Sequence, residues 1–362
     1  MDLSSRISRL SALDGSENIL ILRPEDIRWL SGFTGSTAQL LVQRSSRSGI
    51  LFVDGRYVER AQAEIARSGA PVVIQLVDAR DGVDVALATV VGSTEVAIDL
   101  DHISAARYQR LCENAAVVSH SSPMDALRRV KDNWEIDLMA SAAAMADAAL
   151  QQVVADGLCG RSEKQVRNRL DSLMKENGAD DVGFDTIVAT GPHGARAHHE
   201  PTDSIIEPGH GVVIDFGAEL DGYRSDMTRT IQVGKWSDEY QRMFDIVREA
   251  QLAGVAKVAA GVVGSDIDAA VRAVFAREGV EHEYVHGTGH GIGLYIHEQP
   301  IFSPRCTAVL DVNEVVTVEP GLYRGGVGGV RIEDQVVVTG TECRILTLSP
   351  KELSCPRSPR TI

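Results

Sequence analysis

Positively charged residues are in short supply in this sequence. It has 36 lysines and arginines against 51 aspartates and glutamates, which leaves a formal net charge of −15 at pH 7. A protein that binds the phosphate backbone needs a basic surface, so this balance argues against nucleic acid as a partner. The same acidic excess disfavours attraction to an anionic membrane surface. We therefore expect neither nucleic acid nor membrane lipid among the partners.

Long hydrophobic runs and paired cysteines are also missing. No apolar run reaches the roughly 18 residues of a membrane-spanning helix, so no span is predicted. Residues 1–15 carry no apolar segment behind a basic one, so no secretory signal is visible. The five cysteines are odd in number, scattered and without a C-x-x-C pair, which is typical of reduced thiols. These absences predict a cytoplasmic protein.

The common enzyme motifs are absent as well. The sequence has no H-E-x-x-H, no G-x-S-x-G and no G-x-x-x-x-G-K-[ST]. Residues 287–293 are rich in glycine, but their spacing differs from the dinucleotide fingerprint. His290 also stands where a phosphate cradle would need bare backbone. Zincins, serine hydrolases, P-loop enzymes and Rossmann enzymes are therefore disfavoured.

The composition is that of a globular protein, with 362 residues of which 44% are hydrophobic and 24% charged. At about 100–200 residues per domain, this length suggests two domains. The first part alternates strand-like and helical segments, which predicts an α/β layer. We expect strands over 18–22, 38–43, 51–57, 72–77 and 95–99 and helices over 58–68 and 104–114. The charged segment 128–135 marks the boundary, with domains at 1–128 and 129–362.

The second part begins with helical patterns and continues with glycines and strand-like runs. Helices are expected over 135–156 and 162–177, the latter with Ser162 as its N-cap and Gly178 just past its end. Two more helical patterns cover 238–258 and 265–278. The strand-like runs between them hold the residues that carry chemistry.

Two aspartates flank a predicted hairpin in the segment 212–231. The dipeptide Asp221-Gly222 is a strong turn signal between two strand-like runs. With these residues at the turn, Gly217 lies opposite Asp226, and Asp215 becomes a diagonal neighbour of Asp226, roughly 7–8 Å away. Two converging carboxylates repel each other unless a cation lies between them. The alternative is that both are exposed strand acids, although the apolar residues around Asp215 make exposure awkward.

Three histidines, His286, His290 and His297, fall within twelve residues among glycines. Imidazole is a metal ligand and a proton carrier, although core or surface histidines remain the alternative. Glu319 ends an apolar strand and Glu333 stands inside the next one, where an unpaired carboxylate is unfavourable. Together with the two aspartates, these residues form an oxygen-rich set with one nitrogen ligand, His290. That balance suits two Mn²⁺-like ions better than structural zinc.

These segments resemble the pita-bread metallopeptidases, the superfamily of methionine aminopeptidase, aminopeptidase P, prolidase and creatinase. Five motifs arise in the expected order, at 184–203, 212–230, 286–298, 318–323 and 328–334. Residues 29–42 and 51–61 resemble the creatinase-type N-terminal domain of aminopeptidase P and prolidase. The resemblance implies an α/β N-terminal domain followed by an α+β pita-bread catalytic domain.

The resemblance also implies a role for each matched residue. Two divalent ions, most suitably Mn²⁺ with Co²⁺ or Zn²⁺ as alternatives, would be bound by Asp215, Asp226, His290, Glu319 and Glu333. Asp226 and Glu333 would bridge them, and Glu319 would also act as general base. His198 matches the histidine beside the substrate carbonyl, and His286 and His297 match flanking histidines that hold the peptide and stabilise the oxyanion. Tyr323 and Arg331 match supporting positions, with Arg331 orienting a metal-bound carboxylate.

Departures from the family pattern decide the finer expectations. Ala197 replaces a common proline, and His199 doubles the histidine, so His198 is chosen by its spacing to Pro201, with His199 kept as a substrate contact. No arginine follows His297 until Arg305, although prolidases often have one there to bind a dipeptide's carboxylate. This favours an Xaa-Pro aminopeptidase that acts on peptides with proline at the second position.

Two alternatives remain, an Xaa-Pro dipeptidase and a catalytically silent binding protein on the same fold. The intact ligand set argues against the silent protein. The family usually forms homodimers in which the N-terminal domain lies near the partner's active site. Trp29 would then contact substrate there, with a core position for Trp29 as the equally weighted alternative.

Overall fold

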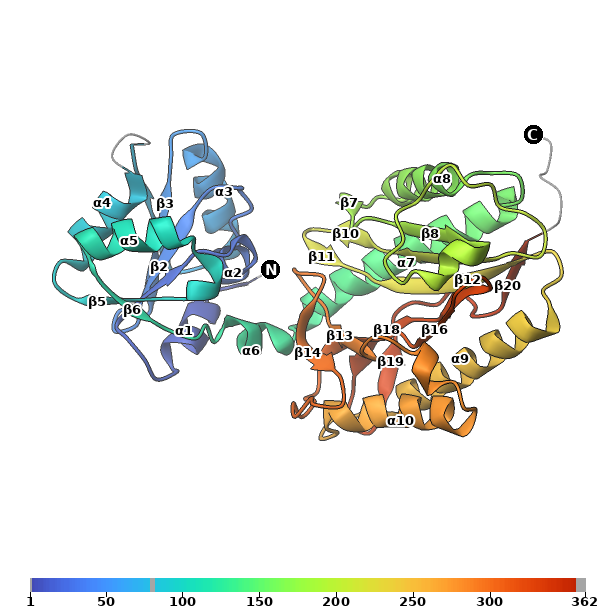
Figure 1. Ribbon diagram of the computed structural model, residues 1–362. Helices are drawn as coiled ribbons and strands as arrows, with labels where there is room; N and C mark the ends of the chain where they lie inside the picture. Colours follow the sequence, from blue (N-terminus) through green and yellow to red (C-terminus); the bar gives the residue numbers. More distant parts are fainter. Residues whose placement is uncertain (1, 79–81, 356–362) are drawn as a thin grey trace. The chain divides into compact units, whose positions relative to one another are not determined.

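The structure is a computed structural model that describes residues 2–78 and 82–355 (Figure 1). The chain divides into two compact units, Met1–Arg128 and Arg129–Ile362. The first unit is a layered α/β domain, and the second is a larger α+β domain. Every residue expected in the active site except Trp29 belongs to the second unit.

One six-stranded sheet forms the centre of the N-terminal unit, in the order β4-β3-β2-β1-β5-β6. β2 runs antiparallel to β1 and β3, whereas the other neighbours are parallel. The strands are β1 (Asn18–Ile21), β2 (Gln39–Gln43), β3 (Ser48–Val53), β4 (Val72–Leu76), β5 (Glu95–Ile98) and β6 (Ala116–Ser119). The helices are α1 (Arg6–Ser11), α2 (Pro24–Ser31), α3 (Val58–Ser68), α4 (Gly82–Val91), α5 (Ala105–Asn114) and α6 (Met124–Arg129), with a short 3₁₀ turn at Leu100–His102.

The predicted α/β alternation of this unit is confirmed. Leu20, Leu41, Phe52 and Ile98 point from the sheet into a buried apolar cluster. The helix expected over 58–68 is present with the same ends, because Gly69 adopts a left-handed φ of 67° and stops it. Sequence reasoning did not predict α2 and α4.

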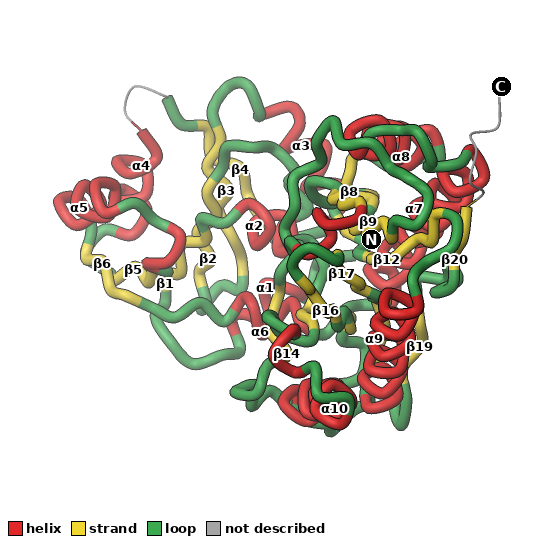
Figure 2. Tube along the Cα trace, turned by 45° about the vertical axis from the view of Figure 1, so that its right-hand side comes forward, coloured by secondary structure: helices red, strands yellow, loops and turns green. Residues whose placement is uncertain are grey.

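Four long helices cover the sheets of the C-terminal unit. They are α7 (Asn133–Asp156), α8 (Glu163–Glu176), α9 (Asp238–Lys257) and α10 (Gly264–Arg277). Figures 1 and 2 show α7 and α8 together on one side of the strands and α9 and α10 on the other. Ser162 caps α8 as predicted, with its side chain accepting from Gln165 N–H while Gln165 bonds back to Ser162 N–H.

Helix α7 is long and apolar enough to cross a membrane when length and composition alone are considered. Its alanine-rich face, however, packs into the core of the unit. Ala142, Ala146, Ala149 and Leu150 are fully buried in one cluster with residues of α8 and of the neighbouring sheet. This packing accounts for the helix's hydropathy.

The described strands of the C-terminal unit, within residues 129–355, form four sheets. Their orders are β20-β12-β9-β8, β14-β13-β15-β18-β19, β11-β10-β7 and β16-β17. The first strands are β7 (Asp181–Val182), β8 (Ile187–Thr190), β9 (Gly211–Phe216), β10 (Ala218–Leu220), β11 (Tyr223–Arg224), β12 (Met227–Val233) and β13 (Gly289–Gly291). The remaining strands are β14 (Glu298–Phe302), β15 (Val315–Val318), β16 (Gly321–Arg324), β17 (Gly328–Arg331), β18 (Asp334–Val338), β19 (Cys343–Ile345) and β20 (Leu353–Cys355). Two 3₁₀ turns lie at Gly191–Ala195 and Glu281–Glu283.

The predicted hairpin register is confirmed. Asp221 and Gly222 form the turn with φ values of 45° and 74°, both in the left-handed region that a type I′ turn requires. Leu220 then pairs with Tyr223 between β10 and β11, and in the same register Asp215 pairs with Thr228 between β9 and β12. This register brings Asp215 and Asp226 to the same cavity, which both residues line.

Candidate metal centre

Asp215 and Asp226 lie on the two arms of the hairpin. Asp215 is near the end of β9, and Asp226 immediately precedes β12, where its side chain is almost fully buried. The backbone N–H of Asp226 donates to Gln335 Oε1 at 3.1 Å, which ties this point of the chain to β18. Asp215 is therefore held by strand pairing with Thr228, and Asp226 by this hydrogen bond to the Gln335 side chain.

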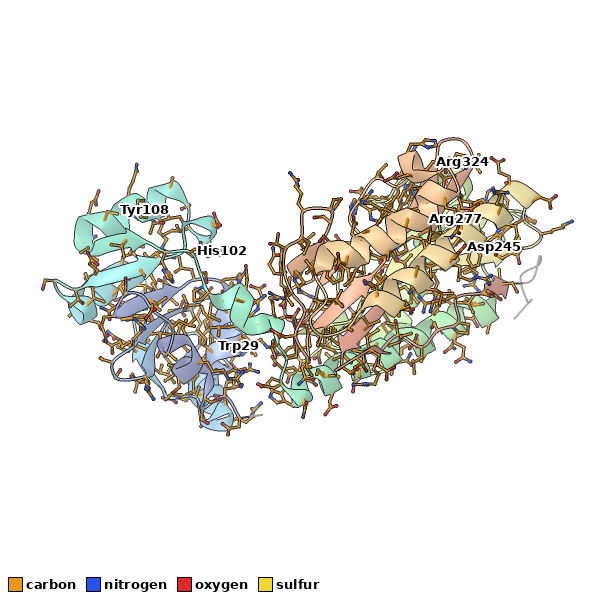
Figure 3. The ribbon with its side chains drawn as sticks, turned by 90° about the horizontal axis from the view of Figure 1, so that it is seen from below. Trp29, His102, Tyr108, Asp245, Arg277 and Arg324 are labelled. Atoms are coloured by element: carbon orange, nitrogen blue, oxygen red, sulfur yellow. The ribbon has the colours of Figure 1, made fainter. Side chains whose placement is uncertain are left out.

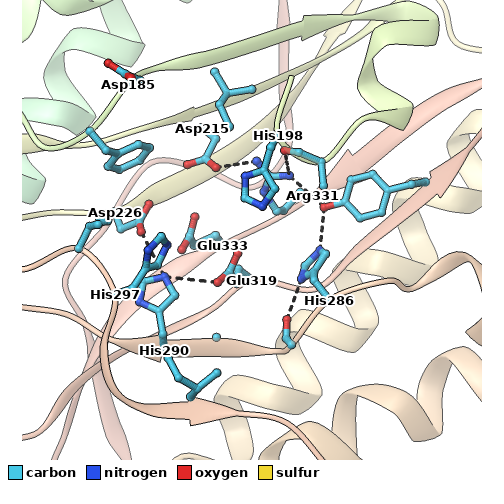
Figure 4. A pocket seen from close by; sticks show the side chains of 18 residues that line it. Asp185, His198, Asp215, Asp226, His286, His290, His297, Glu319, Arg331 and Glu333 are labelled. Atoms are coloured by element: carbon cyan, nitrogen blue, oxygen red, sulfur yellow. Dashed lines mark hydrogen bonds and ion pairs between the residues drawn. The ribbon is translucent and has the colours of Figure 1, made fainter. Parts of the chain in front are cut away.

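His290 lies on β13 and faces the two aspartates across the cavity (Figure 4). Its Nδ1 lies 2.9 Å from the carbonyl oxygen of Gly291. Because a carbonyl can only accept, Nδ1 carries the proton and Nε2 keeps its lone pair. Nε2 lies 3.6 Å from Asp226 Oδ2 and 3.5 Å from Glu319 Oε1. These separations are too long for strong hydrogen bonds and leave room for an ion between the atoms.

Glu319 and Glu333 complete the acidic set. Glu319 follows β15, as predicted, and its N–H donates to Thr288 O at 2.8 Å. The position expected for Glu333 inside a strand is wrong, because it lies in the break between β17 and β18. There the chain leaves one sheet for another, and Glu333 bonds to β12 instead, with its N–H donating to Thr228 O and its Oε2 accepting from Thr228 Oγ1 at 2.8 Å.

The four carboxylates and His290 together are suited to bind divalent ions. Among the described residues, Asp215 Oδ1 and Glu333 Oε1 are buried without a hydrogen-bond partner. Ligand atoms of Asp226, His290 and Glu333 all lie within 4.8 Å of one another. Buried polar atoms need partners, and four carboxylates with one imidazole favour a hard, oxygen-preferring ion.

The raised pKa values of the clustered carboxyl groups also indicate a site for divalent cations. Burial, followed by the charges of Glu333, Asp215 and Glu319, raises the pKa of Asp226 well above its ordinary value. The pKa of Glu333 is also raised, mainly by burial and then by repulsion from the charges of Glu319 and Asp215. The pKa of Glu319 is raised mainly by burial. Divalent cations would reverse this repulsion and stabilise the ionised carboxylates.

Arg331 supports the acidic set from β17. Its Nη2 donates to Asp215 Oδ2 at 2.6 Å, its Nε to Thr228 Oγ1 at 3.1 Å and its Nη1 to Tyr323 Oη at 2.9 Å. Burial opposes its charge, but the surrounding Tyr323, Asp215 and Glu319 raise its pKa, so it stays a cation. The contact expected between Arg331 and a ligand carboxylate is therefore present.

The three remaining cavity histidines differ in what their ring nitrogens can do. His286 Nδ1 lies 2.7 Å from Gly287 O, and its Nε2 lies 2.8 Å from Tyr323 Oη. Both nitrogens are thus engaged, so the oxyanion donation expected of His286 is not supported by this geometry. His198 and His297 also line the cavity, and no hydrogen bond from either ring is found within the described chain. Burial lowers the pKa of His297, which keeps its ring neutral at neutral pH.

Two other expected substrate contacts lie elsewhere. His199 is 4% exposed and points away from the cavity, with its Nε2 2.9 Å from Glu163 Oε2. Trp29, labelled in Figure 3, is 2% exposed in the N-terminal unit and stacks beneath the Arg6 guanidinium at 4.4 Å. Trp29 is therefore a core residue, and neither Trp29 nor His199 is among the residues that line the cavity.

The cavity has a volume of about 380 Å³, within the range of small-molecule sites. Besides the acidic set it is lined by Phe184, Ile187, Ile296 and Ile301, which provide apolar walls, and by Asp185. Sequence reasoning did not assign any of these five residues. Phe184 and Asp185 open the first of the five motifs, so that motif contained the signal that could have found them.

Comparison with known proteins decides the family. The family model described as metallopeptidase family M24 matches residues 137–340, more than half of the chain. The chain is a member of metallopeptidase family M24. A second model, the creatinase/prolidase N-terminal domain, matches residues 6–130 of this M24 enzyme. These matches confirm the predicted α/β N-terminal domain and pita-bread catalytic domain.

Individual relatives agree with this assignment. The uncharacterized peptidase YqhT of Bacillus subtilis is 35% identical over 94% of this chain and 96% of its own. A solved Xaa-Pro dipeptidase from Bacillus anthracis is 36% identical, with a TM-score of 0.92 over 98% of this chain and 100% of its own. An X-Pro aminopeptidase from Thermotoga maritima is 31% identical, with a TM-score of 0.87 over 97% and 99%.

Metal removal should make stability depend on pH with a defined sign. In the metal-free protein the raised pKa values of Asp226, Glu319 and Glu333 mean that the folded state binds protons more tightly than the unfolded chain. Stability therefore falls as pH rises above the ordinary carboxyl range, about 4. Added Mn²⁺ binds the ionised carboxylates, so it should raise Tm more at about pH 8 than at about pH 5.5. Thermal unfolding after chelation, with and without Mn²⁺, measures this, and an equal shift at both values would contradict it.

The two adjacent histidines should respond differently to substitution. His198→Ala should lower kcat about 10²-fold, because it removes an open imidazole from the cavity, and should leave metal content unchanged. His199→Ala should lower the free energy of unfolding by about 1–3 kcal/mol, because it removes a donor from buried Glu163. Turnover, metal analysis and urea unfolding of both variants test this. A larger loss of kcat in His199→Ala would reverse the assignment of the two side chains.

Proposed function

We propose that this M24 enzyme is a dinuclear-metal exopeptidase that releases an N-terminal residue preceding proline. The observation that carries this proposal is the set of four carboxylates and His290 that line one cavity, of which Asp226, Glu333 and His290 are buried. His198 and His297 line the same cavity. Two divalent ions held by that set, most suitably Mn²⁺ with Co²⁺ or Zn²⁺ as alternatives, would polarise the substrate carbonyl and activate water.

The chain's own residues supply proton transfer and orientation. Glu319 takes the proton of the attacking water and passes it to the proline nitrogen, which leaves as a secondary amine. His198 and His297 donate hydrogen bonds to the carbonyl oxygen as negative charge develops on it. Arg331 holds Asp215 in place during these steps.

The lining of the cavity supports the proposal that this enzyme acts on peptides longer than dipeptides. Prolidases often use an arginine to bind the terminal carboxylate of a dipeptide, and Arg331 is the only arginine or lysine among the described lining residues. Its guanidinium is buried and committed to Asp215, Thr228 and Tyr323. Arg305 is exposed and does not line the cavity. We therefore propose aminopeptidase action on Xaa-Pro-Yaa peptides.

A second candidate function is Xaa-Pro dipeptidase. The printed name of the Bacillus anthracis structure favours it, at 36% identity over nearly the whole chain. In that case a histidine of the cavity would bind the dipeptide's carboxylate, because no free arginine is among the described lining residues. The two candidates share the metal centre and differ in the length of substrate accepted.

Substrate length separates the two candidates. With Mn²⁺ present, purified protein should cleave Xaa-Pro-Yaa and longer peptides with a higher kcat/KM than the matching Xaa-Pro dipeptides. Asp226→Asn, assayed in parallel, controls for contaminating peptidases. Cleavage of dipeptides alone would assign the dipeptidase function instead. Absence of cleavage and of any bound divalent ion would contradict the enzymatic proposal itself.

The homodimer and the cytoplasmic location stay predictions.

A further inference from the structure

Outside the metal centre, a second cluster of ligand-type side chains surrounds Glu163, the first residue of α8. Its side chain is fully buried, with 0% exposure. Glu163 Oε1 accepts from Thr190 N–H at 2.8 Å and lies 2.9 Å from His193 Nδ1. Glu163 Oε2 accepts from Thr202 N–H at 2.8 Å and from Thr202 Oγ1 at 2.6 Å, and lies 2.9 Å from His199 Nε2.

All of these donors belong to one segment, residues 190–202, which has little regular structure of its own. Apart from the 3₁₀ turn at Gly191–Ala195, residues 191–202 form no helix or strand. One carboxylate thus gathers donors from the beginning, the middle and the end of the segment. The N-terminal position of Glu163 on α8 adds a favourable interaction with the helix dipole.

The same segment carries His198 to the cavity. The residue before it, Ala197, is held by Arg331, whose Nη1 donates to Ala197 O at 3.3 Å. The residue after it, His199, is held by Glu163. His198 is therefore the unengaged residue between two anchored neighbours, and its ring projects into the cavity (Figure 4).

We propose that Glu163 is a positioning residue, which fixes the 190–202 segment through its donors and thereby places the His198 imidazole beside the substrate carbonyl. The inference rests on the proposed function, because the reaction is what His198 is placed for. Glu163 lies outside the cavity lining and touches no reacting atom.

A hydrogen-bonded clamp explains the cluster better than a third metal ion does. Ligand atoms of Glu163, His193 and His199 do lie within 4.8 Å of one another, as metal ligands would. Both carboxylate oxygens, however, already accept from backbone or hydroxyl donors, unlike the unpartnered oxygens of the metal centre. Burial opposes the charge of Glu163, but these donors lower its pKa to about 2, so the carboxylate is stable without an ion.

The substitution Glu163→Gln tests the proposal. Its single carbonyl oxygen can serve one group of donors, while its amide faces the other and leaves it unpaired. We expect kcat to fall about 10–100-fold with KM and bound Mn²⁺ nearly unchanged. Hydrogen exchange should quicken over residues 190–202 and not over the hairpin that carries Asp226.

A double-mutant cycle with His198→Ala separates positioning from a general loss of stability. If Glu163 acts through His198, the double variant should be no slower than His198→Ala alone. The matched control is Glu314→Gln, another buried carboxylate, which pairs with Arg129 at 2.7 Å away from the cavity. Its effect should be on unfolding only, and it should combine additively with His198→Ala.

Several results would overturn the proposal. The first is a kcat of the Glu163→Gln, His198→Ala double variant that falls by the product of the two single effects. The second is a hydrogen-exchange rate over residues 190–202 that Glu163→Gln leaves unchanged. The third is the loss of a third bound metal ion in Glu163→Gln. If Glu163→Gln fails to fold, the milder His193→Ala, which removes one half-buried donor, should give the same signature with a smaller fall in kcat. An inactive wild-type protein would refute the proposed function, whereas the exchange measurement would still test the clamp.

Discussion

Asp226→Ala should abolish peptide hydrolysis, with kcat/KM falling by at least about 10³-fold, which is about 4 kcal/mol of transition-state stabilisation. Asp226 is buried close to three other carboxylates and His290, and it would help to hold both of the proposed ions. Removing it should therefore weaken binding of both ions together. Metal analysis by mass spectrometry and turnover at saturating Mn²⁺ measure the two effects.

The matched control for this variant is Asp245→Asn, on the exposed face of α9 (Figure 3). The Asp245 side chain is 49% exposed and pairs only loosely with Arg248 at 3.6 Å. Its neutralisation removes the same charge from the protein without touching the cavity, so metal content and turnover should stay unchanged. Full activity in Asp226→Ala would refute the bridging role, whatever the control showed.

Glu319→Gln should have the second largest effect, a fall in kcat of about 10²–10⁴-fold at saturating Mn²⁺. Glutamine keeps the size of the side chain and one oxygen, but it cannot accept the proton of the attacking water. KM should change little, because the lost interaction is made in the transition state rather than in the bound substrate. Steady-state kinetics with an Xaa-Pro-Yaa peptide measure both constants.

Two controls make this second result interpretable. Glu249→Gln removes an exposed carboxylate that pairs with Arg277 at 2.6 Å on the surface, and it should behave as wild type. Raising the Mn²⁺ concentration should restore any lost occupancy in Glu319→Gln but not its kcat. Recovery of kcat with added Mn²⁺ would show that Glu319 acts as a ligand only.

Local patterns in the sequence determined the hairpin and its two aspartates. A two-residue Asp-Gly turn fixes the pairing of both strands, because strand periodicity leaves no freedom once the turn is set. Asp215 and Asp226 consequently lie where the register places them. Helices α3 and α8 were likewise predictable, since their caps and stops lie within a few residues of each end.

Side-chain direction in irregular segments could not be read in this way. His198 lines the cavity, whereas the ring of its neighbour His199 lies against Glu163. In an irregular segment no period of 2 or 3.6 says which way a side chain points. The position of Glu333 failed for a related reason, because the chain changes sheets at that residue.

The sequence by itself determined the family, the order of the motifs and the residue types of the acidic set, because these depend on local spacing and chemical identity. Only the tertiary structure decided that Trp29 is a core residue. It also decided that both ring nitrogens of His286 are in contact with Gly287 O and Tyr323 Oη. In the same way, it decided that Glu163 accepts hydrogen bonds from a segment up to 39 residues away. Such contacts join residues distant in the chain, and their partners are set by the packing of whole elements rather than by neighbouring residues.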